Sequence, residues 1–156
     1  AQSAPDAPVA AAPEPEMDLS PPDLPLHGMP AHAPRGGKAD PAKFVARGEA
    51  LARRGNLAGA LAELKRAVEL DDASDDAHAA LGVVYFQSHQ NDAAVRHLSR
   101  AVQLNAHNGR ALVTLGHVYR AMGDTAKARE VYQRYLRGEP GGRFSSEARQ
   151  ALANVR

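Results

Sequence analysis

Apolar and small side chains recur at helical spacing along the chain from Pro41 onward, and turn signals interrupt them at regular intervals. Phe44, Gly48 and Leu51 lie four and three residues apart, which places them on one face of a helix. The turn signals stand at 55–56, 90–92 and 123–124. Gly in the first and third permits a positive φ, and Asn or Asp in each can cap the following helix. The pattern predicts an all-α fold built from short antiparallel helix pairs.

The pattern repeats every 34 residues, so the chain divides into the segments 41–74, 75–108 and 109–142. Small residues stand at the eighth and twentieth places of each segment. They are Gly48, Gly82 and Gly116 at the eighth place, and Ala60, Ala94 and Ala128 at the twentieth. We expect them where the two helices of a pair cross, because a larger side chain there would keep the backbones apart. One pair cannot bury its apolar face alone, so the three pairs are expected to stack.

This repeat resembles the tetratricopeptide repeat (TPR) family in its length, its Gly and Ala places, Tyr85 and Tyr119 at the eleventh place, and Pro140 near the end of the third repeat. The resemblance implies an α-solenoid, a right-handed superhelix of antiparallel helix pairs that binds other proteins. His78 departs from it, since the family places an aromatic or large apolar residue there. Residues 143–156 lack the Gly and Tyr of a fourth repeat and are predicted to form a capping helix.

Residues 1–40 have a different composition from the rest of the chain. They hold nine of the eleven Pro and no aromatic residue, which predicts a disordered Pro/Ala-rich tether. Six acidic residues against two basic ones give this tail a charge opposite to that of the repeats. Within it, the Met17–Met29 stretch carries scattered Met and Leu. It is either a short binding motif, which could also dock on the repeats of its own chain, or a linker with incidental apolar residues.

The sequence offers no catalytic constellation, no metal site and no cofactor motif, so we expect a protein that is not an enzyme. It has no Cys, and its seven His form no recognised ligand spacing. Five of them are expected on different helices and faces: His78, His89, His97, His107 and His117. The Arg residues are spread over several helices without an aromatic tract, so no nucleic-acid partner is expected. No apolar run approaches the roughly 18 residues that a membrane-spanning helix needs.

In the TPR family the first helix of each repeat lines a concave groove, and the resemblance implies the same here. The expected groove residues are Arg53, Val83, Phe86, Gln87, Arg110, His117 and Arg120. Phe86 would be the aromatic anchor, and the Arg side chains would pair with carboxylates of an amphipathic acidic segment. Chaperone-binding members of the family grip a C-terminal carboxylate with Lys and paired Asn. That clamp is missing here, because the sixth places hold Ala46, Ala80 and Thr114.

We therefore expect a non-enzymatic protein–protein interaction scaffold that binds a peptide or helix of a partner in its concave groove, within a bacterial multiprotein assembly. The alternative is a structural subunit packed permanently into a larger envelope or membrane complex through its convex face or the ends of the array. Residues 1–13 have the composition of a mature exported protein, which favours the periplasm or cell envelope. If the chain is instead a segment of a longer protein, the cytoplasm remains open.

Overall fold

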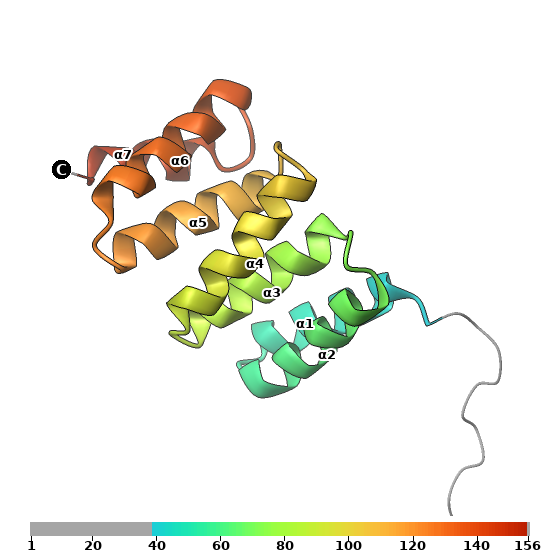
Figure 1. Ribbon diagram of the computed structural model, residues 1–156. Helices are drawn as coiled ribbons and strands as arrows, with labels where there is room; N and C mark the ends of the chain where they lie inside the picture. Colours follow the sequence, from blue (N-terminus) through green and yellow to red (C-terminus); the bar gives the residue numbers. More distant parts are fainter. Residues whose placement is uncertain (1–38, 156) are drawn as a thin grey trace, which may run out of the picture. The chain divides into compact units, whose positions relative to one another are not determined.

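The computed structural model describes residues 39–155, and this part of the chain contains seven α-helices and no strand (Figure 1). The tail with the Met17–Met29 stretch and the terminal Arg156 lie outside the described residues. The helices are α1 (Pro41–Arg53), α2 (Leu57–Leu70), α3 (Asp75–Gln87), α4 (Asn91–Leu104), α5 (Gly109–Ala121), α6 (Thr125–Gly138) and α7 (Ser145–Ala153).

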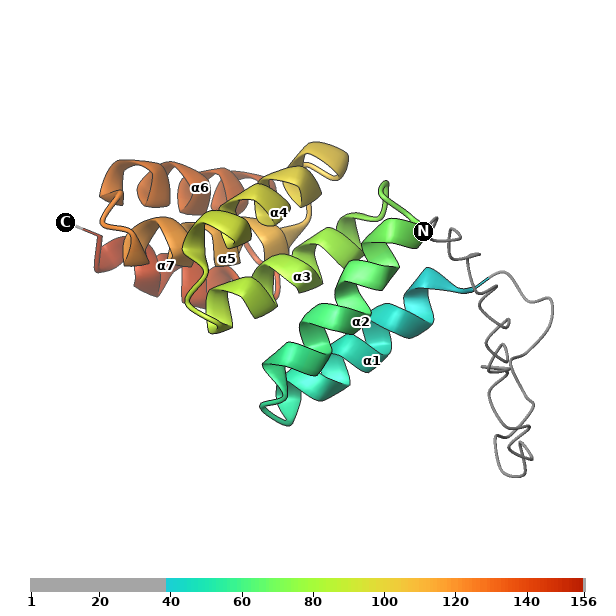
Figure 2. The ribbon, with the colours of Figure 1, turned by 60° about the horizontal axis from the view of Figure 1, so that its bottom comes forward.

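Consecutive helices pack side by side as three pairs, α1 with α2, α3 with α4 and α5 with α6, while α7 packs against α6 (Figures 1 and 2). Turns of three residues join the helices within each pair, which makes each pair antiparallel. Neighbouring pairs contact each other through α2 and α3 and through α4 and α5. The first helices also lie against one another, α1 on α3 and α3 on α5. The predicted all-α solenoid is confirmed.

The helices of each pair cross at the glycine of the eighth place. A Cβ atom added to Gly48 would lie 2.5 Å from Cγ of Leu64, and one added to Gly82 would lie 2.5 Å from Cγ of Leu98. The ring of Tyr132 occupies the same place opposite Gly116. The second helix of each pair therefore fills the space above the glycine with its twenty-fourth-place side chain. The twentieth-place residues Ala60, Ala94 and Ala128 are completely buried beside these contacts.

Side-chain caps begin most of the helices. Asp40, Asn56, Ser74, Asn108 and Asp124 each accept a hydrogen bond from a backbone N–H in the first turn of the following helix. Helices α4 and α7 are the exceptions, because Gln90 and Phe144 precede them without a side-chain bond.

The turn before α4 also departs from the sequence expectation that Asn or Asp caps each second helix. Asn91 and Asp92 lie inside the first turn of α4, so they cannot cap it. His89 has a φ of 58° in this turn, whereas Gly55 and Gly123 take the left-handed conformation in the other two. A non-glycine residue rarely adopts this φ, so the middle turn is the most constrained of the three.

One continuous core runs through the three pairs and α7. Its largest fully buried side chains are Tyr132, Tyr135, Leu64, Leu81 and Leu98. None of the helices within residues 39–155 combines the length and the apolar character needed to cross a bilayer.

Candidate partner-binding groove

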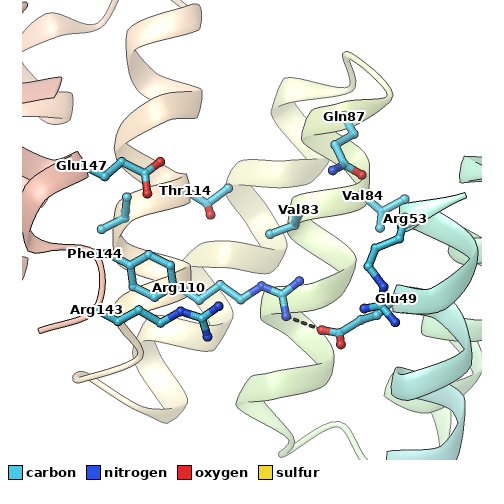
Figure 3. A pocket seen from close by; sticks show the side chains of 12 residues that line it. Glu49, Arg53, Val83, Val84, Gln87, Arg110, Thr114, Arg143, Phe144 and Glu147 are labelled. Carbon is cyan, nitrogen blue, oxygen red and sulfur yellow. Dashed lines mark hydrogen bonds and ion pairs between the residues drawn. The ribbon is translucent and has the colours of Figure 1, made fainter. Parts of the chain in front are cut away.

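A groove of about 460 Å³ crosses the first helices of all three pairs and ends at the segment that leads into α7 (Figure 3). We call this surface the inner groove. Its lining consists of Glu49, Ala52 and Arg53 from α1, Val83, Val84 and Gln87 from α3, Arg110, Val113 and Thr114 from α5, and Arg143, Phe144 and Glu147 from the C-terminal segment. Because α1, α3 and α5 lie against one another, the three repeats present one continuous surface.

Both carboxylates of the inner groove already have partners. Arg110 on α5 pairs with Glu49 on α1, and its side chain extends past α3 to do so (Figure 3). Glu147 Oε1 lies 2.8 Å from Nε2 of His117. By contrast, Arg53 and Arg143 form no ion pair with any residue in the part of the chain that the structure describes. The groove therefore offers positive charge to an incoming segment.

Phe144 is the aromatic side chain of the inner groove, and α6 holds it in place. Its backbone N–H donates a hydrogen bond to the hydroxyl oxygen of Tyr135 at 3.0 Å, and the two rings meet edge to face with centroids 6.3 Å apart. The guanidinium carbon of Arg143 lies 5.4 Å from the centroid of the Phe144 ring. An apolar surface and a cation are thus adjacent at the C-terminal end of the groove.

Four of the seven residues predicted from the sequence line the inner groove: Arg53, Val83, Gln87 and Arg110. Phe86 does not line it, and it packs half-buried against the core. At 3.6 residues per turn, Phe86 points about 160° away from Val84 around α3. The groove face of this helix runs through Val83, Val84 and Gln87, and the aromatic ring that lines the groove belongs to Phe144.

His117 and Arg120 are also absent from the lining, for two different reasons. The Tyr132 hydroxyl lies 2.8 Å from Nδ1 of His117, and Glu147 contacts its Nε2, so both ring nitrogens are engaged. Arg120 is exposed about 9 Å further along α5 than Thr114, at a rise of about 1.5 Å per residue. The groove therefore ends earlier along α5 than expected.

Arg143, Phe144 and Glu147 were not predicted to line the groove, because the sequence indicated only a capping helix for this segment. The signal lies in the glycines before them. A Cβ atom on Gly142 would come within 2.5 Å of the Tyr135 hydroxyl, so the chain passes close to α6 there. This close passage directs the following residues back toward the groove.

Two histidines that the sequence analysis placed on separate faces meet in the structure, so that expectation is wrong for them. Nδ1 of His78 on α3 lies 3.1 Å from Nδ1 of His97 on α4. Tyr85 stacks on His97 with ring centroids 5.4 Å apart. Burial, followed by the charges of His78, Arg96 and Lys65, lowers the pKa of His97 to about 4. No group of three or more metal-ligating side chains occurs within residues 39–155.

A profile described as tetratricopeptide repeat matches residues 85–155, and one described as TPR repeat matches residues 48–89. The chain belongs to the tetratricopeptide repeat family. The two matches together run from residue 48, within α1, to residue 155, so the resemblance read from the eighth and twentieth places is confirmed. No curated protein sequence matches the chain.

Several solved structures share this TPR fold. The crystal structure of MamA is 30% identical, with a TM-score of 0.68 over 74% of this chain and 66% of that chain. A second MamA structure is also 30% identical, and the chain covers 61% of it. The first TPR domain of Spaghetti (RPAP3), bound to the HSP90 peptide SRMEEVD, is 19% identical, with a TM-score of 0.70 over 76% of this chain and 92% of that one. At this identity the Spaghetti domain shows similarity of fold alone.

Proposed function

We propose that this TPR array is a non-enzymatic scaffold that binds a peptide or helix of a partner protein in its inner groove. The observation that carries the proposal is the convergence of three helix pairs and the C-terminal segment on one open surface. Val83 and Phe144 provide apolar contact there, and Arg53 and Arg143 provide charge. Interfaces are anchored most strongly by aromatic and Arg side chains, and the groove supplies both.

The peptide complex of the Spaghetti domain supports this proposal through its fold. That domain shares the stacked helix pairs and holds a peptide of a partner protein. We further propose that the array works within a bacterial multiprotein assembly. The Pro/Ala-rich composition of residues 1–40 is typical of a tether, which supports attachment of the repeats to such an assembly.

Affinity capture with paired variants of the middle repeat tests the proposal. Val83→Glu places a carboxylate in the floor of the inner groove, while Gln103→Glu places one on the exposed face of α4. The groove variant should recover about tenfold less partner, because burying an unpaired charge at the contact costs about 1.4 kcal/mol or more. The α4 variant should recover the wild-type amount. Circular dichroism of both variants establishes that they fold.

The reverse result would favour the alternative of a permanently packed structural subunit. In that case Gln103→Glu, or a matched change at the ends of the array, weakens capture and Val83→Glu leaves it unchanged. Equal capture by the wild type and by Val83→Glu contradicts the groove proposal.

We also propose that the Met17–Met29 stretch competes for the inner groove. It carries Asp18 and Asp23 beside Leu19 and Leu24, which suits a groove that offers Arg and apolar surface. Residues 30–39 can span up to about 35 Å when extended, and α1 is only about 20 Å long. The stretch can therefore reach the groove of its own chain.

Replacing Asp18 and Asp23 with Asn in the full chain tests this competition. The backbone amide shifts of Val83, Arg110 and Phe144 should change, because the carboxylates no longer draw the stretch to the groove. Added salt should move the wild-type shifts in the same direction, since it screens the same attraction. The control is Asp6→Asn, which changes the tail charge outside the stretch. Identical spectra for all chains contradict self-docking.

A further inference from the structure

We infer that the inner groove selects an acidic internal segment of its partner, in which carboxylates flank an apolar side chain, and that the Arg143–Phe144 turn is a selecting element. This inference rests on the proposed function and adds to it the chemistry of the occupant. The two residues come from outside the three repeats, in the segment before α7.

The first step is the balance of charge in the inner groove. Its acidic residues, Glu49 and Glu147, are held by Arg110 and His117. Arg53 and Arg143 remain without an ion pair among residues 39–155, and both are exposed. An acidic segment gains charge-assisted hydrogen bonds from them, whereas a basic segment would have to break existing pairs.

The second step is the position of the two cations. Arg53 belongs to α1 and Arg143 to the opposite side of the groove, with α3 and α5 between them (Figure 3). A single terminal carboxylate cannot serve both. Two carboxylates on one continuous segment can, and both can be side chains, so the segment needs no chain terminus and can be an internal stretch.

The third step is the apolar surface between the cations. Val83 and Val113 form the floor, and the ring of Phe144 forms one wall. The contact with Tyr135 fixes the position of Phe144, so little conformational entropy is lost when a side chain packs on it. An aliphatic side chain between the two carboxylates fits this surface.

Fluorescence anisotropy with short synthetic peptides tests the inference on the full chain. The peptides have acetylated and amidated ends, so they carry no terminal carboxylate. One has Asp and Glu around a central Leu, a second has Lys in place of the acidic residues, and a third has Ser in place of Leu. The acidic Leu peptide should bind best, and the Ser peptide about tenfold more weakly, the loss equivalent to about 1.4 kcal/mol.

Charge reversal in the protein gives the sharper test. The Arg53→Glu, Arg143→Glu double variant should bind the acidic peptide at least about tenfold more weakly and should gain affinity for the Lys peptide. The control is Arg66→Glu, an exposed residue of α2 outside the groove, which should change neither. Tighter binding of the acidic peptide by the Asp18→Asn, Asp23→Asn chain would also support the inference, because this chain has lost the carboxylates with which the wild-type tail competes for the groove.

The outcomes separate this inference from the proposed function. If the Ser or Lys peptide binds best to the wild type, or if the double variant keeps its affinity for the acidic Leu peptide, the inferred chemistry is wrong and the groove remains a binding site. If a peptide that contains the partner's own segment binds equally to the wild type and to Val83→Glu, the proposed function fails as well.

Discussion

Replacing Gly82 with Leu should lower the free energy of unfolding by about 1–3 kcal/mol or more and reduce the Tm by several degrees. A Cβ atom at this position would lie 2.5 Å from Cγ and 3.2 Å from the backbone N of Leu98. To make room for the new side chain, either the fully buried side chain of Leu98 must move or α3 and α4 must separate. Thermal unfolding followed by circular dichroism measures the loss.

The matched control for this prediction is Gly141→Leu. Gly141 is exposed, and a Cβ atom there would meet no heavy atom within 4 Å. This variant adds the same side chain without crowding a helix crossing, so its Tm should stay close to that of the wild type. If the two variants unfold at the same temperature, the crossing does not limit the size of residue 82.

The fold could be predicted because one packing problem recurs in the chain. Each pair needs a residue without a side chain at its crossing, so glycine returns at Gly48, Gly82 and Gly116. The residue that packs on the glycine is less constrained, and it is Leu in two pairs and Tyr132 in the third. Periodicity therefore predicts the helices and their crossings better than it predicts which side chains pack at each crossing.

The inner groove was harder to predict, because its boundary depends on contacts between distant parts of the chain. The family positions indicated Arg53, Val83 and Arg110, which lie on the repeated helices themselves. Nothing in the 34-residue period describes where the chain goes after Pro140. Gly142 lies close to Tyr135, and the hydroxyl of Tyr135 accepts a hydrogen bond from the backbone N–H of Phe144, so these contacts place Phe144 at the groove.

The His78–His97 contact is a second case that periodicity cannot reveal. The two residues are 19 positions apart on different helices. Their spacing matches no ligand motif, and only the packing of α3 on α4 brings them together. Tyr85 adds a third ring to the stack. The cluster therefore combines the Tyr of the eleventh place, which is typical of the family, with two histidines.

This cluster should make the array less stable in acid. Nε2 of His78 lies 3.2 Å from the carbonyl oxygen of Asp72 and 3.4 Å from its carboxylate, so this nitrogen carries a proton and donates it. Nδ1 of His78 faces Nδ1 of His97, and only one proton fits between them. Protonating both rings fully therefore breaks the bond between them.

The charged groups around His97 act in the same direction. Lys65 from α2 and Arg96 from its own helix α4 disfavour a positive charge on the ring, and so does His78 from α3. The carboxylate of Asp72, in the turn before α3, lies by contrast beside His78 and within 3.5 Å of Arg100. Burial is the largest cause, and together these effects lower the pKa of His97 from 6.5 to about 4.

The sign of the effect follows from proton linkage. Below pH 6.5 the unfolded chain binds a proton at His97, whereas the folded chain binds this proton only below about pH 4. Stability from this group is therefore fully present above pH 6.5 and is lost as the pH falls toward 4. A shift of this size corresponds to about 3 kcal/mol for a fully buried group. His97 is only half-buried, so water screens part of the effect and we expect about 1–2 kcal/mol.

Urea unfolding of the full chain near neutral pH and again near pH 4 measures this loss, and His97→Asn isolates it from the other titrating groups. Asn keeps a hydrogen-bonding group near the position of Nδ1 but does not titrate, so the difference in unfolding free energy between the two pH values should shrink by about 1–2 kcal/mol. The stacking on Tyr85 is lost at both pH values and cancels in that difference. His107→Asn, at an exposed residue of the turn after α4, should retain the full wild-type difference. If His97→Asn also retains the full difference between the two pH values, the His78–His97 contact does not cause the acid sensitivity. The packed interface of α3 and α4 would then accept a positive charge on His97, contrary to what its geometry predicts.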